Sequence, residues 1–242
     1  AHKKISIRAA GLNHFTWMLD VRERATGRDL LPTLRANLTG RVHDTFEPLT
    51  RHLAAVTGHV PVSGDTHLSE YLPFTARAKA WQRYAIQPYD HAWSERRRRE
   101  ARSLIDRLSR GEGDLEVLRG ADGEGAEDVM HAIWNHTGEL LEAVNIPNRG
   151  ALPALDAHAV VEVPATGDAS GLQSVVCELP PVIAGWCRRE TDVVERVVDA
   201  ALGGGRRSAL DALLLDPMVG DLDLAERLLA DYADAYPELG WG

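Results

Sequence analysis

An imidazole follows directly after a predicted strand near the start of the chain. Residues 5–9 alternate apolar and polar side chains, as a half-buried strand does, and run into Gly11-Leu12-Asn13-His14. Side chains in this position commonly enter a cleft. His14 is therefore a candidate functional residue, although an isolated Asn-His pair is also typical of a histidine that is hydrogen-bonded in the core.

A second segment, residues 63–74, gathers three more reactive side chains. His67, Glu70 and Tyr71 lie at i, i+3 and i+4, on one face of a short helix that Asp65 or Thr66 would cap. A tyrosine, with a free pKa near 10, becomes a useful base only beside a cation or metal. Taken alone, Tyr71 is better interpreted as a packed aromatic residue with a solvated hydroxyl group. His67 and Glu70 could simply pair with each other on the surface.

A third segment, residues 145–153 followed by 161–164, is rich in amide and guanidinium donors, among them Asn148 and Arg149. These donors could bind a polar ligand, or the segment could be a structured connection without a ligand. The run Arg96 to Arg99 is interpreted as a solvated helix face because the chain as a whole is acidic.

Composition restricts the classes of function. The 242 residues carry a net charge of −9, and the pI is about 5.6, so neither a nucleic-acid nor an anionic-membrane partner is expected. No apolar run approaches the roughly 18 residues of a membrane span. Cys177 and Cys187 fit neither a zinc knuckle nor a disulfide framework, which favours a reducing, cytoplasmic compartment.

The elements that must position these side chains are mostly helices. We expect a helix over residues 32–56, kinked or split at Pro48 and stopped by Gly58. Further helices are expected at 94–109, 126–144, 181–202, 208–215 and 222–236, and strands at 159–164 and 175–177. The fold class is a helix-dominated α+β domain whose few strands lie near the turn motifs.

In this order and at these separations, the segments resemble the C-terminal part of glycoside hydrolase family four, the NAD- and divalent-metal-dependent glycosidases. The resemblance runs from about residue 5 to residue 237. It includes the Glu178-Leu179-Pro180 turn and the helix end at residues 213–217. It implies the C-terminal domain of the lactate/malate dehydrogenase-like type, with small antiparallel sheets.

The resemblance also implies roles. His14 would be a ligand of the catalytic metal, usually manganese, and Tyr71 the base that removes the sugar C2 proton. His67 and Glu70 resemble residues of the branch that acts on unphosphorylated sugars, which favours an α-galactoside or α-galacturonide. Asn13, Asn148 and Arg149 are assigned to substrate binding. NAD⁺ would take hydride from C3, the metal would polarise the ketone, and elimination at C1 would expel the leaving group.

Two sequence features of the family, a dinucleotide-binding motif and a metal-binding cysteine, have no counterpart in this sequence. No dinucleotide-binding glycine fingerprint follows an early strand, and no cysteine lies shortly upstream of His14. Residues 1–242 are therefore expected to be the C-terminal catalytic, substrate-binding and oligomerisation domain. NAD and Mn²⁺ binding, and with them turnover, are expected only when an N-terminal half is present.

Two other functions stay open at this point. One is a 2-hydroxyacid dehydrogenase of the lactate/malate superfamily, although no suitable arginine and histidine pair is apparent. The other is a non-catalytic dimerisation fragment that uses the helices of residues 181–236. Because members of the family that the chain resembles commonly form dimers or tetramers, a homodimer or homotetramer is expected. The glycosidase interpretation depends on His14 and Tyr71 facing one cleft.

Overall fold

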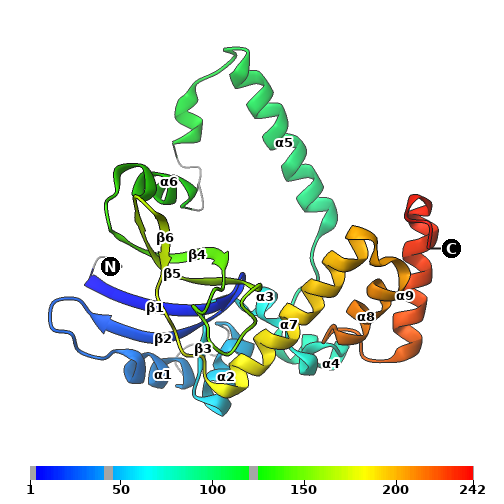
Figure 1. Ribbon diagram of the computed structural model, residues 1–242, viewed down its shortest axis with the longest axis horizontal. Coiled ribbons are helices and arrows are strands. Elements are labelled where there is room, and N and C mark those ends of the chain that lie inside the picture. The colour runs from blue at the N-terminus through cyan, green and yellow to red at the C-terminus, as the bar shows by residue number, and fades with distance from the viewer. Residues whose placement is uncertain (1–3, 41–45, 120–124, 242) are drawn as a thin grey trace.

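The computed structural model describes residues 4–40, 46–119 and 125–241. An antiparallel sheet in the order β3-β2-β1-β5-β4, with β6 paired to β5, forms one side of the molecule, and helices surround it (Figure 1). The predicted class, a helix-dominated α+β fold with a small antiparallel sheet, is confirmed. In the described part of the chain, no helix is long and apolar enough to cross a membrane.

The hairpin of β1 (Ile5–Leu12) and β2 (Phe15–Glu23) carries Asn13 and His14 at its tip. The predicted strand is confirmed and extends to Leu12. At Gly11, whose φ is +157°, a Cβ atom would lie 2.3 Å from the Phe15 carbonyl oxygen, so no larger residue fits. Gly11 also pairs with Glu162 on β5, which brings that carboxylate to the tip.

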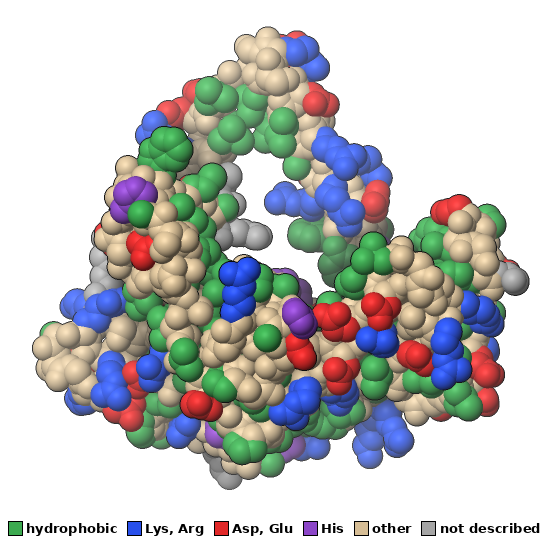
Figure 2. Space-filling view, in the orientation of Figure 1, with side chains coloured by type: hydrophobic (Ala, Val, Ile, Leu, Met, Phe, Trp, Pro, Cys, Tyr) green, Lys and Arg blue, Asp and Glu red, His purple; other side chains and the backbone are tan. Residues whose placement is uncertain are grey.

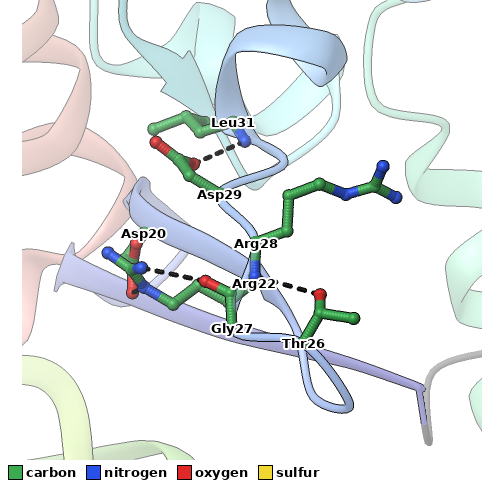
Figure 3. Close-up of polar contacts among 7 residues, drawn as sticks. All are labelled: Asp20, Arg22, Thr26, Gly27, Arg28, Asp29 and Leu31. Carbon is green, nitrogen blue, oxygen red and sulfur yellow. Dashed lines mark hydrogen bonds and ion pairs between the residues drawn. The ribbon is translucent and has the colours of Figure 1, made fainter.

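The helix expected over residues 32–56 is two helices. These are α1 (Leu31–Thr39) and α2 (Pro48–Thr57), with Pro48 at the start of the second and Gly58, at φ +73°, ending it as expected. The link from β2 to α1 is held by local hydrogen bonds. Arg22 donates to the Gly27 carbonyl, and the Asp29 carboxylate accepts from the Leu31 amide (Figure 3).

Part of the helix expected over residues 126–144 is a strand. Helix α6 (Ala126–Asn135) ends at His136, whose φ of +53° is left-handed, and Gly138, at φ +65°, continues the turn. Strand β4 (Leu140–Pro147) then pairs with β5 (Val160–Asp168). The periodicity of apolar residues did not reveal this break, because the helix ends at a histidine and a glycine in left-handed conformations.

The strand expected at 175–177 is also wrong. The second strand of that hairpin is β6 (Gly171–Ser174), which turns at Gly171, and the residues after it run without regular structure to the next helix. The three C-terminal helices are confirmed. They are α7 (Pro181–Asp199), α8 (Gly205–Leu215) and α9 (Leu222–Ala235), and the Asp221 side chain caps α9.

The main core lies under the hairpin tip. Phe15, Trp17, Leu68, Val161 and Ile183 are almost fully buried there and join the sheet to α7 and to the short helix α3 (Asp65–Glu70). Short elements complete this region: β3 (Val60–Pro61), η3 (Pro73–Thr75), α4 (Ala78–Tyr84) and, at the C-terminus, η6 (Pro237–Leu239).

Helix α5 (His91–Ser109) projects away from the rest of the molecule and leads to η4 (Leu115–Leu118) (Figure 1). Ser94 is the one buried residue of α5. Arg96 to Arg99 are exposed, as predicted for a solvated face, and basic side chains gather over this helix in Figure 2.

Candidate functional site

Helix α3 carries Tyr71 at its C-terminal end and is fixed to α2 by a carboxylate. The Asp65 side chain accepts hydrogen bonds from the amides of Leu49 (2.6 Å) and Thr50 (2.8 Å). Asp65 therefore satisfies free donors in the first turn of α2. The prediction that Asp65 or Thr66 caps its own helix is corrected, because Gly64 occupies the N-cap position of α3.

The Tyr71 side chain is oriented by contacts from two sides. Its ring stacks on Phe15, with centroids 4.8 Å apart and planes 24° apart. Its hydroxyl donates to the Asn13 carbonyl oxygen at 3.3 Å. The Arg189 guanidinium of α7 donates to the Tyr71 carbonyl oxygen at 2.8 Å and so fixes the backbone. The phenol is thus directed at the hairpin tip.

The other candidates of the first two segments gather at the same place. The His14 and His67 rings lie with centroids 4.4 Å apart. His67 Nδ1 is 3.6 Å from a Glu70 carboxylate oxygen, and Asn13 donates to Glu162 at 3.3 Å. The structure therefore brings together residues that were predicted from segments almost sixty positions apart.

A cavity of about 360 Å³ opens beside Tyr71 and Asn13, between the hairpin tip, the β4–β5 edge and α7, and its described lining does not include His14, His67 or Glu70. We call it the Tyr71 pocket. Its wall contains aliphatic residues and the polar side chains of Asn13, Tyr71, Asn145, His158, Glu190, Thr191 and Glu195. A larger apolar cavity of about 600 Å³ lies between α2, α4 and α7 and contains none of the predicted site residues.

Burial and three carboxylates control the titration of the site. Burial, followed by the charges of Glu190, Glu70 and Glu162, raises the pKa of Tyr71 to about 12. Burial, followed by the Asp216 charge, raises the pKa of Glu190 to about 7, and Arg189 opposes the shift. In this chain by itself, the Tyr71 phenolate is thus disfavoured, and a nearby cation would have to reverse the shift.

Burial also raises the pKa of Glu162, and hydrogen bonds from Asn13 and Asn145 oppose that shift. The third segment of the sequence analysis included Asn145 and Glu162 without assigning either a role, and Glu190 was not singled out. Glu162 carried a usable signal, since it is a charged residue in an otherwise apolar strand. Glu190 carried none, because it is one of several charged residues along α7.

Asn148 and Arg149 are placed differently. The Asn148 side chain is fully buried and donates to the carbonyl oxygens of Leu152, Leu155 and Asp156, while its oxygen accepts from the Leu152 amide. We therefore assign Asn148 a structural role in its loop, in place of the direct substrate contact that was predicted. Arg149 is exposed, with φ +42°, and is not among the residues that line the Tyr71 pocket.

The described residues do not form a complete metal site. Among the residues that the structure describes, no group of three or more His, Cys, Asp or Glu side chains is arranged to hold a metal ion. His14 at the exposed hairpin tip fits as one ligand, and one imidazole binds a divalent ion weakly. A complete coordination shell would need ligands from outside the described residues.

Comparison with known proteins identifies the family. The model of the family 4 glycosyl hydrolase C-terminal domain matches residues 9–219. The chain belongs to this family. It is 28% identical over 240 residues to the phospho-alpha-glucosidase PagL of Clostridium acetobutylicum, and the match covers 93% of this chain and 54% of that protein.

The chain is also 29% identical over 248 residues to an alpha-galacturonidase of Bacillus subtilis, covering 94% of this chain and 53% of that protein. Its fold matches the crystal structure of a 6-phospho-alpha-glucosidase from gut microorganisms in complex with NAD and Mn²⁺, with a TM-score of 0.74 and 20% identity. That match covers 99% of this chain and 56% of the other. The chain thus spans about half the length of the family members that it matches.

Proposed function

We propose that this chain is the substrate-side half of a glycosidase that cleaves a non-phosphorylated α-glycoside, an α-galactoside or an α-galacturonide. The observation that carries the proposal is the position of the Tyr71 phenol. Its hydroxyl donates to the carbonyl oxygen of Asn13, the residue before His14, and the side chain lines a cavity. The alpha-galacturonidase of Bacillus subtilis among the relatives supports the substrate class.

In this proposal Tyr71 removes the proton from C2 of the sugar. Stacking on Phe15 and the hydrogen bond to the Asn13 carbonyl hold the phenol in one orientation, which a positioned base requires. Bound NAD⁺ and Mn²⁺ would supply oxidation at C3 and Lewis-acid polarisation of the resulting ketone. His14 would be this chain's ligand to the metal.

The titration of the site explains why this chain would need the rest of the protein. Tyr71, with a pKa of about 12, is a weak base at neutral pH unless a cation stabilises its phenolate. The side chains of His67 and Glu70 are about half exposed and lie outside the lining of the Tyr71 pocket. They are therefore free to contact a sugar hydroxyl group, and Arg149 stays a further predicted substrate contact.

The surface supports self-association, and we propose a homodimer or homotetramer in the cytoplasm. Helix α5 exposes Trp93 and Ile105 by more than half, and η4 exposes Leu115 and Val117 to a similar extent. Such apolar surface commonly marks an interface. Both cysteines are buried and free, as suits a reducing compartment.

The dehydrogenase alternative receives no support from the geometry. Such an enzyme would bind a substrate carboxylate through an arginine, and the described lining of the Tyr71 pocket contains no arginine. A purely structural fragment is the alternative that remains to be tested by activity.

The test is turnover of the complete gene product with NAD⁺, Mn²⁺ and nitrophenyl α-glycosides. Tyr71→Phe should lower kcat by about 10²- to 10⁴-fold, the usual contribution of a general base, with NAD binding intact. Tyr232→Phe, on the exposed face of α9, is the matched control and should leave the rate unchanged. An unchanged rate in Tyr71→Phe would refute the assigned role.

A further inference from the structure

The larger cavity, between α2, α4 and α7, has a rim of one charge, and we call it the α2–α4 groove. Its described lining contains Arg77, Lys79 and Arg83 and no aspartate or glutamate. No carboxylate of the described residues forms an ion pair with any of these three cations. In a chain with a net charge of −9, an apolar hollow bordered by cations favours an occupant that is both acidic and apolar.

The apolar wall of the α2–α4 groove is uncovered in a single copy of the chain. Phe74 is about half exposed there, and Val56 is exposed by more than half. The volume of about 600 Å³ lies within the usual range of binding cavities. No residue of α9 or η6 belongs to the described lining. Exposed apolar surface of this kind commonly marks an interface.

The end of α9 and the residues after it have the complementary character. Tyr232 and Tyr236 are about half exposed, and their rings stack with centroids 6.3 Å apart. The same segment carries three exposed carboxylates, those of Asp231, Asp234 and Glu238. Residues 228–241 contain no lysine, arginine or histidine. Residues 231–238, which we call the acidic tyrosine segment, therefore combine aromatic rings with negative charge.

We propose that the acidic tyrosine segment of a second copy of this chain docks in the α2–α4 groove, and that the contact is reciprocal. The tyrosine rings enter the apolar hollow, and the carboxylates face the cations of the rim. Tyrosine suits such a place because its ring is apolar and its hydroxyl group can stay in contact with water. Two equal contacts about a twofold axis close the assembly as a dimer.

Charge favours a second copy over the other exposed apolar element of the chain. Helix α5 carries six arginines against three acidic residues, so it has the same sign of charge as the groove rim and is a poor occupant. The acidic tyrosine segment has the opposite sign, and each copy offers both surfaces. This inference rests on the self-association in the proposed function and identifies the surfaces that produce it.

The first test is sedimentation of the full 242-residue chain over a range of concentrations. Val56→Asp places a carboxylate in the groove, where it repels the segment, and Tyr236→Ala removes one of the two rings. Both side chains are exposed, so the fold should survive. Each substitution should raise the dissociation constant of the dimer about tenfold or more, as for a residue at the centre of an interface. Val176→Asp, at an exposed valine outside the groove, and Tyr232→Phe, which keeps the ring, should leave the constant unchanged.

Cysteine cross-linking then locates the contact. Under oxidation, a mixture of Lys79→Cys and Tyr236→Cys chains should give a mixed disulfide dimer, while both native cysteines are buried. Gln173→Cys, at an exposed position of β6, replaces Lys79→Cys in the control and should give no such dimer.

Three results would overturn the proposal: a chain that stays monomeric, a dimer that Val56→Asp and Tyr236→Ala leave intact, or equal cross-linking from Gln173→Cys. The second result would refute the groove as the interface and leave the proposed self-association in place. Turnover of the complete protein tests the glycosidase function separately.

Discussion

At the scale of single residues, the chemistry of the site depends on groups that are costly to bury. The Tyr71 phenol and the carboxylates of Glu162 and Glu190 all have raised pKa values, and burial is the main cause in each case. Perturbed groups of this kind concentrate at functional sites. Asn148 is the contrasting case, since its buried amide makes all of its contacts within its own loop.

Glu190 should make stability depend on pH. Its pKa is about 7 in the folded chain and near 4.5 when unfolded. The folded state therefore binds this proton more tightly, and the resulting stabilisation is complete below pH 4.5 and is lost as pH rises through about 7. Relative to Glu190→Gln, the wild type should lose about 1 kcal/mol of unfolding free energy between pH 5 and pH 8, after allowance for solvent screening.

Urea unfolding of both proteins at the two pH values measures this difference, and other titrating groups cancel in the comparison. Asp192→Asn, on the exposed side of α7, should follow the wild type. A difference between wild type and Glu190→Gln that is constant across pH would show that Glu190 does not titrate in this range.

Asn148→Ala should destabilise the chain strongly. The substitution removes three hydrogen bonds to carbonyl oxygens and one from the Leu152 amide, and of those carbonyls only Leu152 and Asp156 keep a backbone hydrogen bond. At about 1 kcal/mol for each of the four lost bonds, the expected loss is roughly 4 kcal/mol in urea unfolding. Asn37→Ala, on the exposed face of α1, should change stability by less than about 0.5 kcal/mol. A similarly small loss of stability in Asn148→Ala would contradict the structural role and favour the predicted substrate contact.

At the scale of elements, the site is the meeting point of the β1–β2 hairpin, α3 and α7. The sequence was sufficient to predict the strand before His14, the short helix before Tyr71 and the long helix α7, because apolar periodicity and prolines mark them. It was not sufficient for β4 or β6. Their boundaries depend on left-handed His136 and on Gly138 and Gly171, which also have positive φ, and the periodicity of apolar residues does not indicate such turns.

The same reasoning explains which site residues were found. His14 and Tyr71 stand in recognisable motifs, so their sequence context was informative. The pairing of Gly11 with Glu162 and the approach of Glu190 are tertiary contacts between distant segments. No local pattern in one sequence encodes such contacts. Asn148 has a donor-rich context of the kind that also occurs in binding loops, and only its burial shows its structural role.

Gly11→Ala should disrupt the hairpin tip. The added Cβ atom would lie 2.3 Å from the Phe15 carbonyl oxygen, and the backbone there cannot yield without moving Asn13 and His14. We expect a loss of about 2 kcal/mol or more, as for other residues forced into a strained backbone. Gly185→Ala, in α7 with open space around it, should instead be neutral or stabilising by up to about 1 kcal/mol. Thermal unfolding of both variants makes the comparison, and equal behaviour would contradict the close approach at Gly11.

At the scale of the whole molecule, the chain has a folded core and part of the proposed catalytic site. Its described residues supply a phenol, an imidazole and an acidic pocket, but not a complete set of metal ligands. The family members that it matches are about twice its length. The 242-residue chain alone should therefore show no turnover of nitrophenyl α-glycosides with NAD⁺ and Mn²⁺, in a standard release assay. Measurable turnover would refute the view that the described residues form only part of the site.

The most direct test of the central claim follows the fate of one hydrogen atom. If Tyr71 removes the C2 proton, hydrolysis by the complete protein in D₂O should give a sugar that carries deuterium at C2, detectable by NMR and mass spectrometry. Tyr71→Phe should abolish that incorporation together with turnover. A product formed at the normal rate with its original hydrogen at C2 would contradict the account.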